Sequence, residues 1–155
     1  MGLFSTTFQH PEFGPFTKGL FGMWKGRMSL QNNQNVEVRL PGSGREPEPR
    51  SFSLLKDLTT RYPDLQKEIE KYLYEHYEPY REANDAGEEV AAAGGQFPRI
   101  NLSSDVWKST KPVRVAVDSI SKLEIAFEVA WDEEHIVGAT IDNWKVVDFC
   151  GSVGP

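Results

Sequence analysis

The fold of this chain is set by LEIAFEVAW at residues 123–131. Every second position of this stretch carries a large apolar side chain: Leu123, Ile125, Phe127, Val129 and Trp131. Successive side chains of a β-strand point to opposite faces, so the alternation predicts a strand with one face on a hydrophobic core. Such a face needs a cover, which the rest of the chain must provide.

The residues on both sides of this strand continue the pattern. Residues 113–117 and 137–141 alternate in the same way, and residues 145–149 close the run. The pair Asp142–Asn143 suits a two-residue turn of type I′, because both residues accept a positive φ. We therefore predict a four-strand antiparallel meander in the C-terminal third.

The N-terminal third predicts a further hairpin. Residues 23–30 and 36–40 alternate apolar and polar side chains, and the intervening QNNQN at 31–35 has the composition of a turn. Residues 16–21 predict a short strand, whereas Pro11, Gly14 and Pro15 predict that residues 1–15 are irregular.

The middle of the chain predicts helices. Apolar and aromatic residues recur there at steps of three and four, as on one stripe of a helix. The stripe consists of Phe52, Leu55, Leu58, Tyr62, Leu65, Ile69, Tyr72, His76 and Tyr80. Pro63 interrupts it, because a proline ring clashes with the carbonyl four residues earlier. We predict two helices, at residues 53–61 and 64–82.

Together these segments predict an α+β fold, in which an antiparallel sheet packs against two central helices. The sheet comprises the N-terminal hairpin and the C-terminal four-strand meander. The chain has 155 residues, of which 39% are hydrophobic, so we expect one domain over residues 1–155. The segment NDAGEEVAAAGGQFP at 84–98 offers few side chains that pack, and we expect a flexible connector there.

The composition narrows the classes of function. A net charge of −6 and a pI near 5.1 disfavour nucleic-acid binding, which needs clustered Lys and Arg. No apolar run reaches the roughly 20 residues of a membrane-spanning helix, and the start MGLFSTTFQH lacks the features of a secretory signal. The single Cys150 fits the reducing cytoplasm. Gly94–Gly95 lacks the Lys and Ser/Thr of a phosphate loop, and we expect no cofactor.

Acidic side chains gather in two separate segments. The first contains Glu82, Asp85, Glu88 and Glu89, and the second contains Asp132, Glu133 and Glu134. Such acids either serve solubility or attract a basic partner by long-range steering. In the second case Tyr80 and Trp144 are candidate aromatic anchors of a protein–protein interface.

Asp132, Glu133, Glu134 and His135 follow the long strand directly. We predict a structured hairpin end, in which Asp132 accepts hydrogen bonds from backbone amides and His135 orients against it. Two carboxylates and an imidazole are also suited to a metal site or to acid–base chemistry, and this alternative stays open.

The same residues carry a resemblance to known proteins. EIAFEVAWDEEH, followed by VGATID and KVVDF, resembles the end of a group of small bacterial domains of unknown function. Their signature runs Trp-Asp-x-Glu-His-Gly; Trp131, Asp132, Glu134 and His135 match it, whereas Ile136 replaces the glycine. WKGRMSL and LTTRYPDLQKEIEKYLYEHY are similar to this group in order and spacing. The resemblance implies an immunity protein of an interbacterial toxin system.

We therefore expect a non-catalytic cytoplasmic binding protein that holds no metal, and more specifically an immunity protein that neutralises a basic toxin. One alternative is a metal-dependent or acid–base enzyme that uses Asp132, Glu134 and His135. The other alternative is a structural or regulatory homodimer formed through an exposed sheet edge. The sequence leaves the oligomeric state open.

Overall fold

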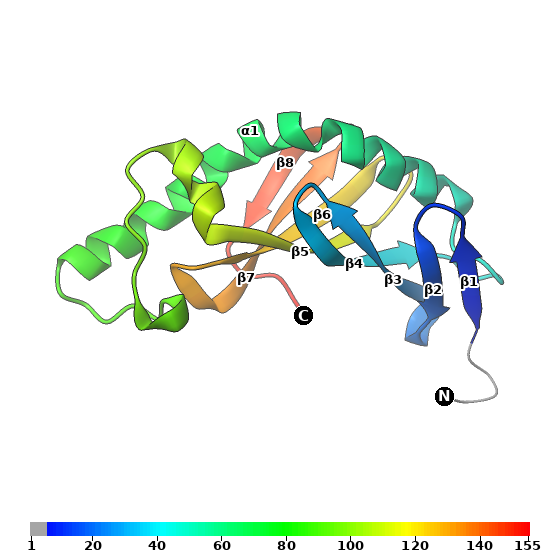
Figure 1. Ribbon diagram of the computed structural model, residues 1–155, viewed down its shortest axis with the longest axis horizontal. Coiled ribbons are helices and arrows are strands. Elements are labelled where there is room, and N and C mark those ends of the chain that lie inside the picture. The colour runs from blue at the N-terminus through cyan, green and yellow to red at the C-terminus, as the bar shows by residue number, and fades with distance from the viewer. Residues whose placement is uncertain (1–5) are drawn as a thin grey trace.

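The apolar row at residues 123–131 lies on the sixth strand of an eight-stranded sheet and on the turn after it (Figure 1). The computed structural model describes residues 6–155. The strands are β1 (Thr7–His10), β2 (Gly14–Lys18), β3 (Met23–Leu30), β4 (Asn33–Pro41), β5 (Thr110–Val117), β6 (Lys122–Val129), β7 (Asp132–Asp142) and β8 (Lys145–Cys150). The described residues also contain one α-helix, α1 (Pro49–Asp85), and three 3₁₀ helices, η1 (Leu20–Gly22), η2 (Ala93–Gly95) and η3 (Ser103–Ser109).

The eight strands lie in the sheet in their order along the chain. All neighbours are antiparallel except β4 and β5, which are parallel and are connected through α1 and η3. The predicted α+β class is confirmed, as are the hairpin (β3 and β4) and the four-strand meander (β5 to β8). The sheet is larger than predicted, because the parallel pair joins the hairpin to the meander and β1 and β2 extend it.

The first strand replaces part of the segment predicted to be irregular. Residues 7–10 form β1, in which Phe8 lies opposite Phe16 of β2. The prediction was wrong there because β1 gains a tertiary contact that its local sequence does not reveal. Phe52 of α1 stacks on Phe8 and on His10, with ring centroids 5.7 and 4.2 Å apart. Residues 1–5 of the predicted segment lie outside the described residues.

The residues predicted as two helices are helical, and they join through Pro63 into the single helix α1. Tyr62 and Leu65, on either side of this proline, are both buried. Their burial against the sheet outweighs the lost backbone hydrogen bond, and α1 curves over one face of the sheet (Figure 1). Within the described residues, no helix carries an apolar stretch long enough to cross a membrane.

The buried stripe of α1 departs from the predicted one after Ile69. Leu73 and Tyr77 continue it and are fully buried, whereas Tyr72, His76 and Tyr80 are half-buried. Both sets follow helical spacing, and the position of the sheet selects the first set. The second set therefore lies on the flank of α1, where it contacts β8 and the start of β7.

The C-terminal residues cross the face of the sheet that points away from α1 (Figure 1). Val153 donates its backbone N–H to the carbonyl of Ile136, at 2.8 Å. Arg114 of β5 donates to the carbonyl of Gly154 at 2.7 Å. A Cβ atom at Gly138 would lie 2.7 Å from the Cγ1 atom of Val153. Residues 151–155 thus depend on the missing side chain at position 138.

We expect Gly138→Ala to lower the free energy of unfolding by about 1 kcal/mol, because the added methyl group overlaps the side chain of Val153. Urea unfolding followed by circular dichroism measures the change. Val153→Ala, combined with Gly138→Ala, should recover part of the loss by removing the overlapping atom. Gly44→Ala is the control, since a Cβ there meets nothing within 4 Å. A double variant as unstable as the sum of its single variants would contradict the overlap.

Candidate functional site

Asp132 begins β7 and is the centre of a hydrogen-bonded cluster. Its side chain is only 3% exposed. One carboxylate oxygen accepts the hydroxyl of Tyr80, at 2.6 Å, and the other accepts the backbone N–H of Glu134, at 3.1 Å. Nδ1 of His135 lies 2.9 Å from Oδ2. The predicted bond from a backbone amide to Asp132 and the predicted orientation of His135 against it are both confirmed.

These contacts keep the carboxyl group of Asp132 ionised. Burial alone would raise its pKa, but the hydrogen bonds from Tyr80 and His135 outweigh burial and hold the pKa below its ordinary value. Burial and the adjacent carboxylate raise the pKa of Tyr80 to about 12, so its hydroxyl stays a donor. The pair therefore forms a charge-assisted hydrogen bond between α1 and β7.

The side chains proposed for metal or acid–base chemistry converge only in part. Asp132 and His135 meet, whereas Glu134 contributes its backbone N–H to the cluster. Across residues 6–155, no three His, Cys, Asp or Glu side chains gather closely enough to hold a metal ion. The imidazole of His135 is 44% exposed and bonds Asp132 through Nδ1. This arrangement orients the ring of one histidine and leaves its Nε2 atom without a hydrogen-bond partner among residues 6–155.

The structure brings the two acidic segments together at one end of the molecule. The bond from Tyr80 to Asp132 connects the last turns of α1 to the start of β7. The connector adds two backbone bonds, from Ala93 to the carbonyl of Ala130 and from Glu133 to the carbonyl of Ala91, each at 2.9 Å. We call this region the acidic end. Its exposed acids are Glu82, Asp85, Glu88, Glu89, Glu133 and Glu134.

Most carboxylates of the acidic end lack a basic neighbour. Asp85 pairs with Arg99 at 2.6 Å. Among residues 6–155, no Lys, Arg or His lies within 4 Å of the carboxylates of the other five exposed acids. Five negative charges on one end of a small protein create a field that attracts cations from solution.

A second hydrogen bond joins α1 to the turn between β6 and β7, and its partner residue was not predicted. The indole N–H of Trp131 donates to Nδ1 of His76, at 2.9 Å. Burial lowers the pKa of His76 and the charge of Asp132 opposes this only in part, so the imidazole is held neutral. The sequence offered a partial signal, namely a histidine on the edge of an apolar helical stripe, but its partner lies 55 residues away.

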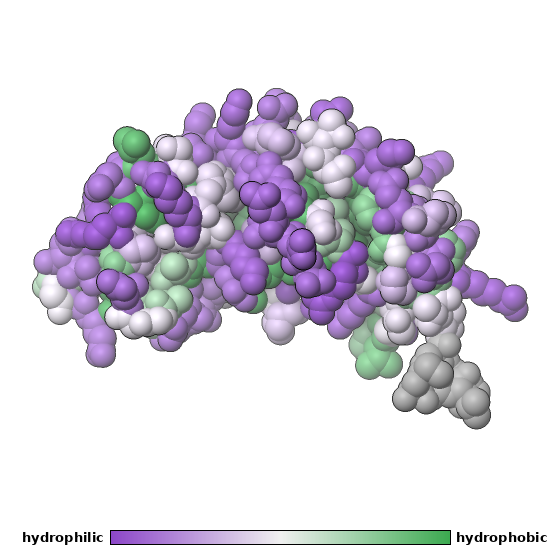
Figure 2. Space-filling model, in the orientation of Figure 1, coloured by the Kyte–Doolittle hydropathy of each residue, from purple (hydrophilic) through white to green (hydrophobic). Residues whose placement is uncertain are grey.

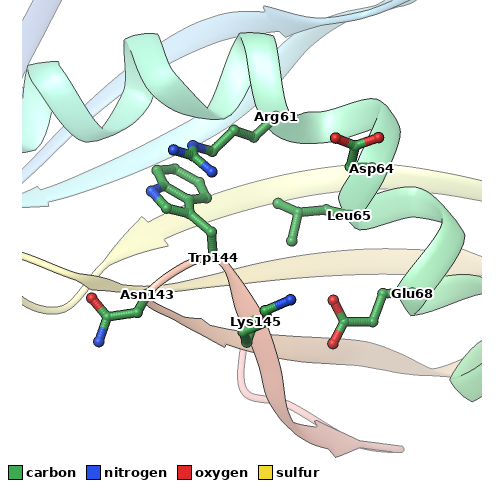
Figure 3. A pocket seen from close by; sticks show the side chains of 7 residues that line it. All are labelled: Arg61, Asp64, Leu65, Glu68, Asn143, Trp144 and Lys145. Carbon is green, nitrogen blue, oxygen red and sulfur yellow. The ribbon is translucent and has the colours of Figure 1, made fainter.

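Trp144 lies in a separate pocket of about 270 Å³ between α1 and the turn from β7 to β8 (Figure 3). The guanidinium of Arg61 lies over the indole, 5.1 Å from the ring centroid, and Leu65 faces the ring from the same helix. Glu68 accepts the backbone N–H of Val146 at 3.1 Å, and this bond holds β8 against α1. Asp64, Asn143 and Lys145 complete the lining.

The turn that carries Trp144 is shifted by one residue from the predicted one. Asn143 and Trp144, not Asp142 and Asn143, have positive φ angles, of 48° and 63°. Asp142 instead pairs with Lys145 as the last rung of the hairpin. A bulky aromatic residue is costly in this conformation, by about 1–3 kcal/mol, so the indole remains there against a local preference for glycine or asparagine.

Trp144 does not belong to the acidic end. Arg61, which covers it, lies 19 residues before Tyr80 on α1, and this spacing corresponds to about 28 Å along a helix. The predicted partner-binding residues therefore form two areas on one side of α1, rather than one surface.

The geometry defines a small α+β domain with one covering helix, an ordered acid–histidine cluster and an acidic end. The profile of the family described as domain of unknown function DUF6985 matches residues 12–154, so the chain belongs to this family. Membership in a family of domains of unknown function was predicted and is confirmed. No curated protein and no solved structure matches the chain.

We expect Tyr80→Phe to destabilise the protein by about 1–2 kcal/mol near neutral pH, because it removes the charge-assisted bond to Asp132. The pKa of Asp132 is lowered in the fold, so the stability it contributes is present above its ordinary pKa and is lost as the pH falls through the lowered value. The difference between the variant and the parent should therefore narrow in acid.

Urea unfolding of both proteins across this pH range makes the comparison. Tyr74→Phe is the control, since the hydroxyl of Tyr74 has no hydrogen-bond partner in the described side chains. A loss of stability for Tyr80→Phe that stays constant down to strong acid would contradict a bond to an ionised carboxylate.

Proposed function

We propose that this protein is a non-catalytic binding protein of the cytoplasm, and that it captures a basic protein partner through its acidic end. More specifically, we propose that it is an immunity protein and that the partner is a toxin. The single observation that carries the proposal is the convergence of two acidic segments at one end, where five exposed carboxylates have no cation within 4 Å among residues 6–155.

The cluster around Asp132 supports this role by its rigidity. Tyr80 and His135 hold the carboxylate of Asp132 inward, and the backbone of Glu133 is bonded to Ala91. Glu133 and Glu134 are therefore displayed on the ordered start of β7, and less conformational entropy is lost when a partner binds. Electrostatic complementarity of this kind acts mainly on the association rate and on the choice of partner.

The rest of the surface is consistent with recognition by charge. The face in Figure 2 is largely hydrophilic, and its hydrophobic areas are small and separate. The exposed large hydrophobic residues of the described chain are Leu20, Phe21, Leu102, Ile120 and Val147. They are spread over several elements, so they offer scattered contacts rather than one broad apolar interface.

Two further functions remain as proposals. The bond between Asp132 and His135 is the observation that favours acid–base chemistry, since a carboxylate at Nδ1 leaves Nε2 to exchange a proton. Loss of an activity in His135→Ala, with no change in stability, would support it. A homodimer through β8 is less favoured, because Val147 is left out of the pairing with β7 and Glu68 already occupies the N–H of Val146.

The test of partner capture removes the charges of the acidic end. The variant replaces five acids by glutamine: Glu82, Glu88, Glu89, Glu133 and Glu134. We expect the association rate with the product of a neighbouring toxin gene to fall at least about tenfold at low salt, and the salt dependence to flatten. Surface plasmon resonance over a series of salt concentrations measures both effects.

A control variant removes the same number of charges elsewhere. It neutralises five exposed acids outside the acidic end: Glu12, Glu46, Glu48, Asp57 and Asp118. It should retain most of the association rate, because steering depends on where the charges lie as well as on their sum. Equal losses in the two variants, or no binding of the parent at low salt, would refute capture by the acidic end.

A further inference from the structure

A second cavity lies on the same side of α1, between the Trp144 pocket and the acidic end. It has a volume of about 440 Å³ and we call it the Phe149 pocket. Its lining consists of Tyr72, Glu75 and His76 from α1, Val147, Asp148 and Phe149 from β8, and Gly151. The helical residues share one face because they are spaced by three and four.

Aromatic rings form one wall of the Phe149 pocket. Tyr72 and Phe149 are stacked, with ring centroids 5.7 Å apart and an angle of 18° between their planes. The ring of His76 meets Phe149 edge-on at 6.1 Å. Two of these rings come from one element and the third from another, so the wall is held from both sides. Such a wall attracts cations through the negative faces of its rings.

The charge of the Phe149 pocket is entirely negative. Glu75 and Asp148 are its ionisable acids, and neither has an ion-pair partner among residues 6–155. Asp148 accepts the N–H of Phe149 through Oδ1, which fixes the carboxylate while Oδ2 remains available. His76 adds no positive charge, because its Nδ1 accepts the indole N–H of Trp131 and therefore carries no proton.

Gly151 lines the pocket next to the ring of His76. A Cβ atom at Gly151 would lie 3.2 Å from Nε2 of His76, closer than ordinary van der Waals contact. A side chain at position 151 would therefore press against the imidazole of His76.

We propose that the Phe149 pocket receives an arginine side chain of the partner. An arginine fits better than a lysine, because a planar guanidinium stacks on aromatic rings and donates a fork of hydrogen bonds to a carboxylate. This proposal rests on the proposed function for its partner and adds a residue that the partner must present. Capture by the acidic end brings the basic partner close, and the pocket, located about midway between the acidic end and Trp144, binds one of its side chains.

The test uses the full chain and N-acetyl-arginine-methylamide as the probe. The chain has three histidines, and only His76 lines the pocket, so its imidazole resonance reports binding while that of His10, on β1, serves as the internal reference. We expect a saturable shift at His76 with a Kd on the order of a few millimolar, as suits a single side chain. The citrulline analogue, which has the same shape without the charge, should shift it at least about fivefold less at equal concentration.

Matched variants separate the pocket from the overall charge. Glu75→Gln with Asp148→Asn should raise the Kd of the probe at least about fivefold, and both substitutions keep a carbonyl oxygen as acceptor. Glu46→Gln with Asp118→Asn removes two exposed charges elsewhere and should leave the Kd unchanged. Equal shifts with the citrulline analogue, no saturation, or equal effects of the two double variants would overturn the proposal.

The five-acid variant of the acidic end is the last arm of the test. It should bind the probe as the parent does, because none of its substitutions lines the Phe149 pocket. Binding of the probe therefore tests the Phe149 pocket, and the association rate with the partner tests capture by the acidic end. The two proposals can fail independently.

Discussion

The buried row of β6 and the buried stripe of α1 meet in one hydrophobic core. Leu123, Ile125 and Phe127 on the strand and Leu58 and Ile69 on the helix are each at most 1% exposed. Each such side chain contributes about 1.5–3 kcal/mol by leaving water. This contact also keeps α1 helical through Pro63, since an interruption there would withdraw Tyr62 and Leu65 from the sheet. The position and rotation of α1 then determine what else the molecule can display.

The rotation of α1 places its polar functional groups. Because Leu73 and Tyr77 face the sheet, the adjacent positions Tyr72, His76 and Tyr80 lie along the flank. Each flank residue meets a partner from the C-terminal strands or the turn before β7: a stacked ring, an indole N–H or a carboxylate. The contacts of α1 with the C-terminal strands thus follow one another along the helix, and the last of them adjoins the exposed acids of the acidic end.

The face of the sheet away from α1 and the last strand are each partly covered by other groups of the chain. Ala126 and Gly138 lie opposite each other on β6 and β7, and their small size leaves a channel that residues 151–155 fill. Ala126 is fully buried although it points away from the core. At β8, the side chains of Glu68 and Asp148 occupy the amides of Val146 and Phe149. The C-terminal residues therefore cover part of this face, and β8 offers few free amides to another strand.

Local sequence patterns predicted most strands, the helical region and part of the cluster around Asp132. The alternation at 123–131, the hairpin around residue 31 and the helical repeat from residue 52 are periodic signals, which each segment carries without reference to the rest. The contacts of Asp132 with Glu134 and His135 were predictable for the same reason, since they span two and three residues. The prediction placed the turn one residue too early, at 142–143 instead of 143–144. An aspartate accepts a positive φ more readily than a tryptophan does, so the local preference favoured Asp142 over Trp144.

Chain order and composition therefore specify an acidic α+β domain with its strands, its helical region and its capped turn. Three features required the folded chain: the parallel pairing of β4 with β5, the bond of Tyr80 to Asp132 across 52 residues, and the pocket between α1 and β8. Each joins groups that are distant in sequence, and which groups meet depends on how one helix packs across a whole sheet. The periodicity of apolar residues within each segment can be read from a single sequence, whereas the angle at which the helix packs on the sheet cannot.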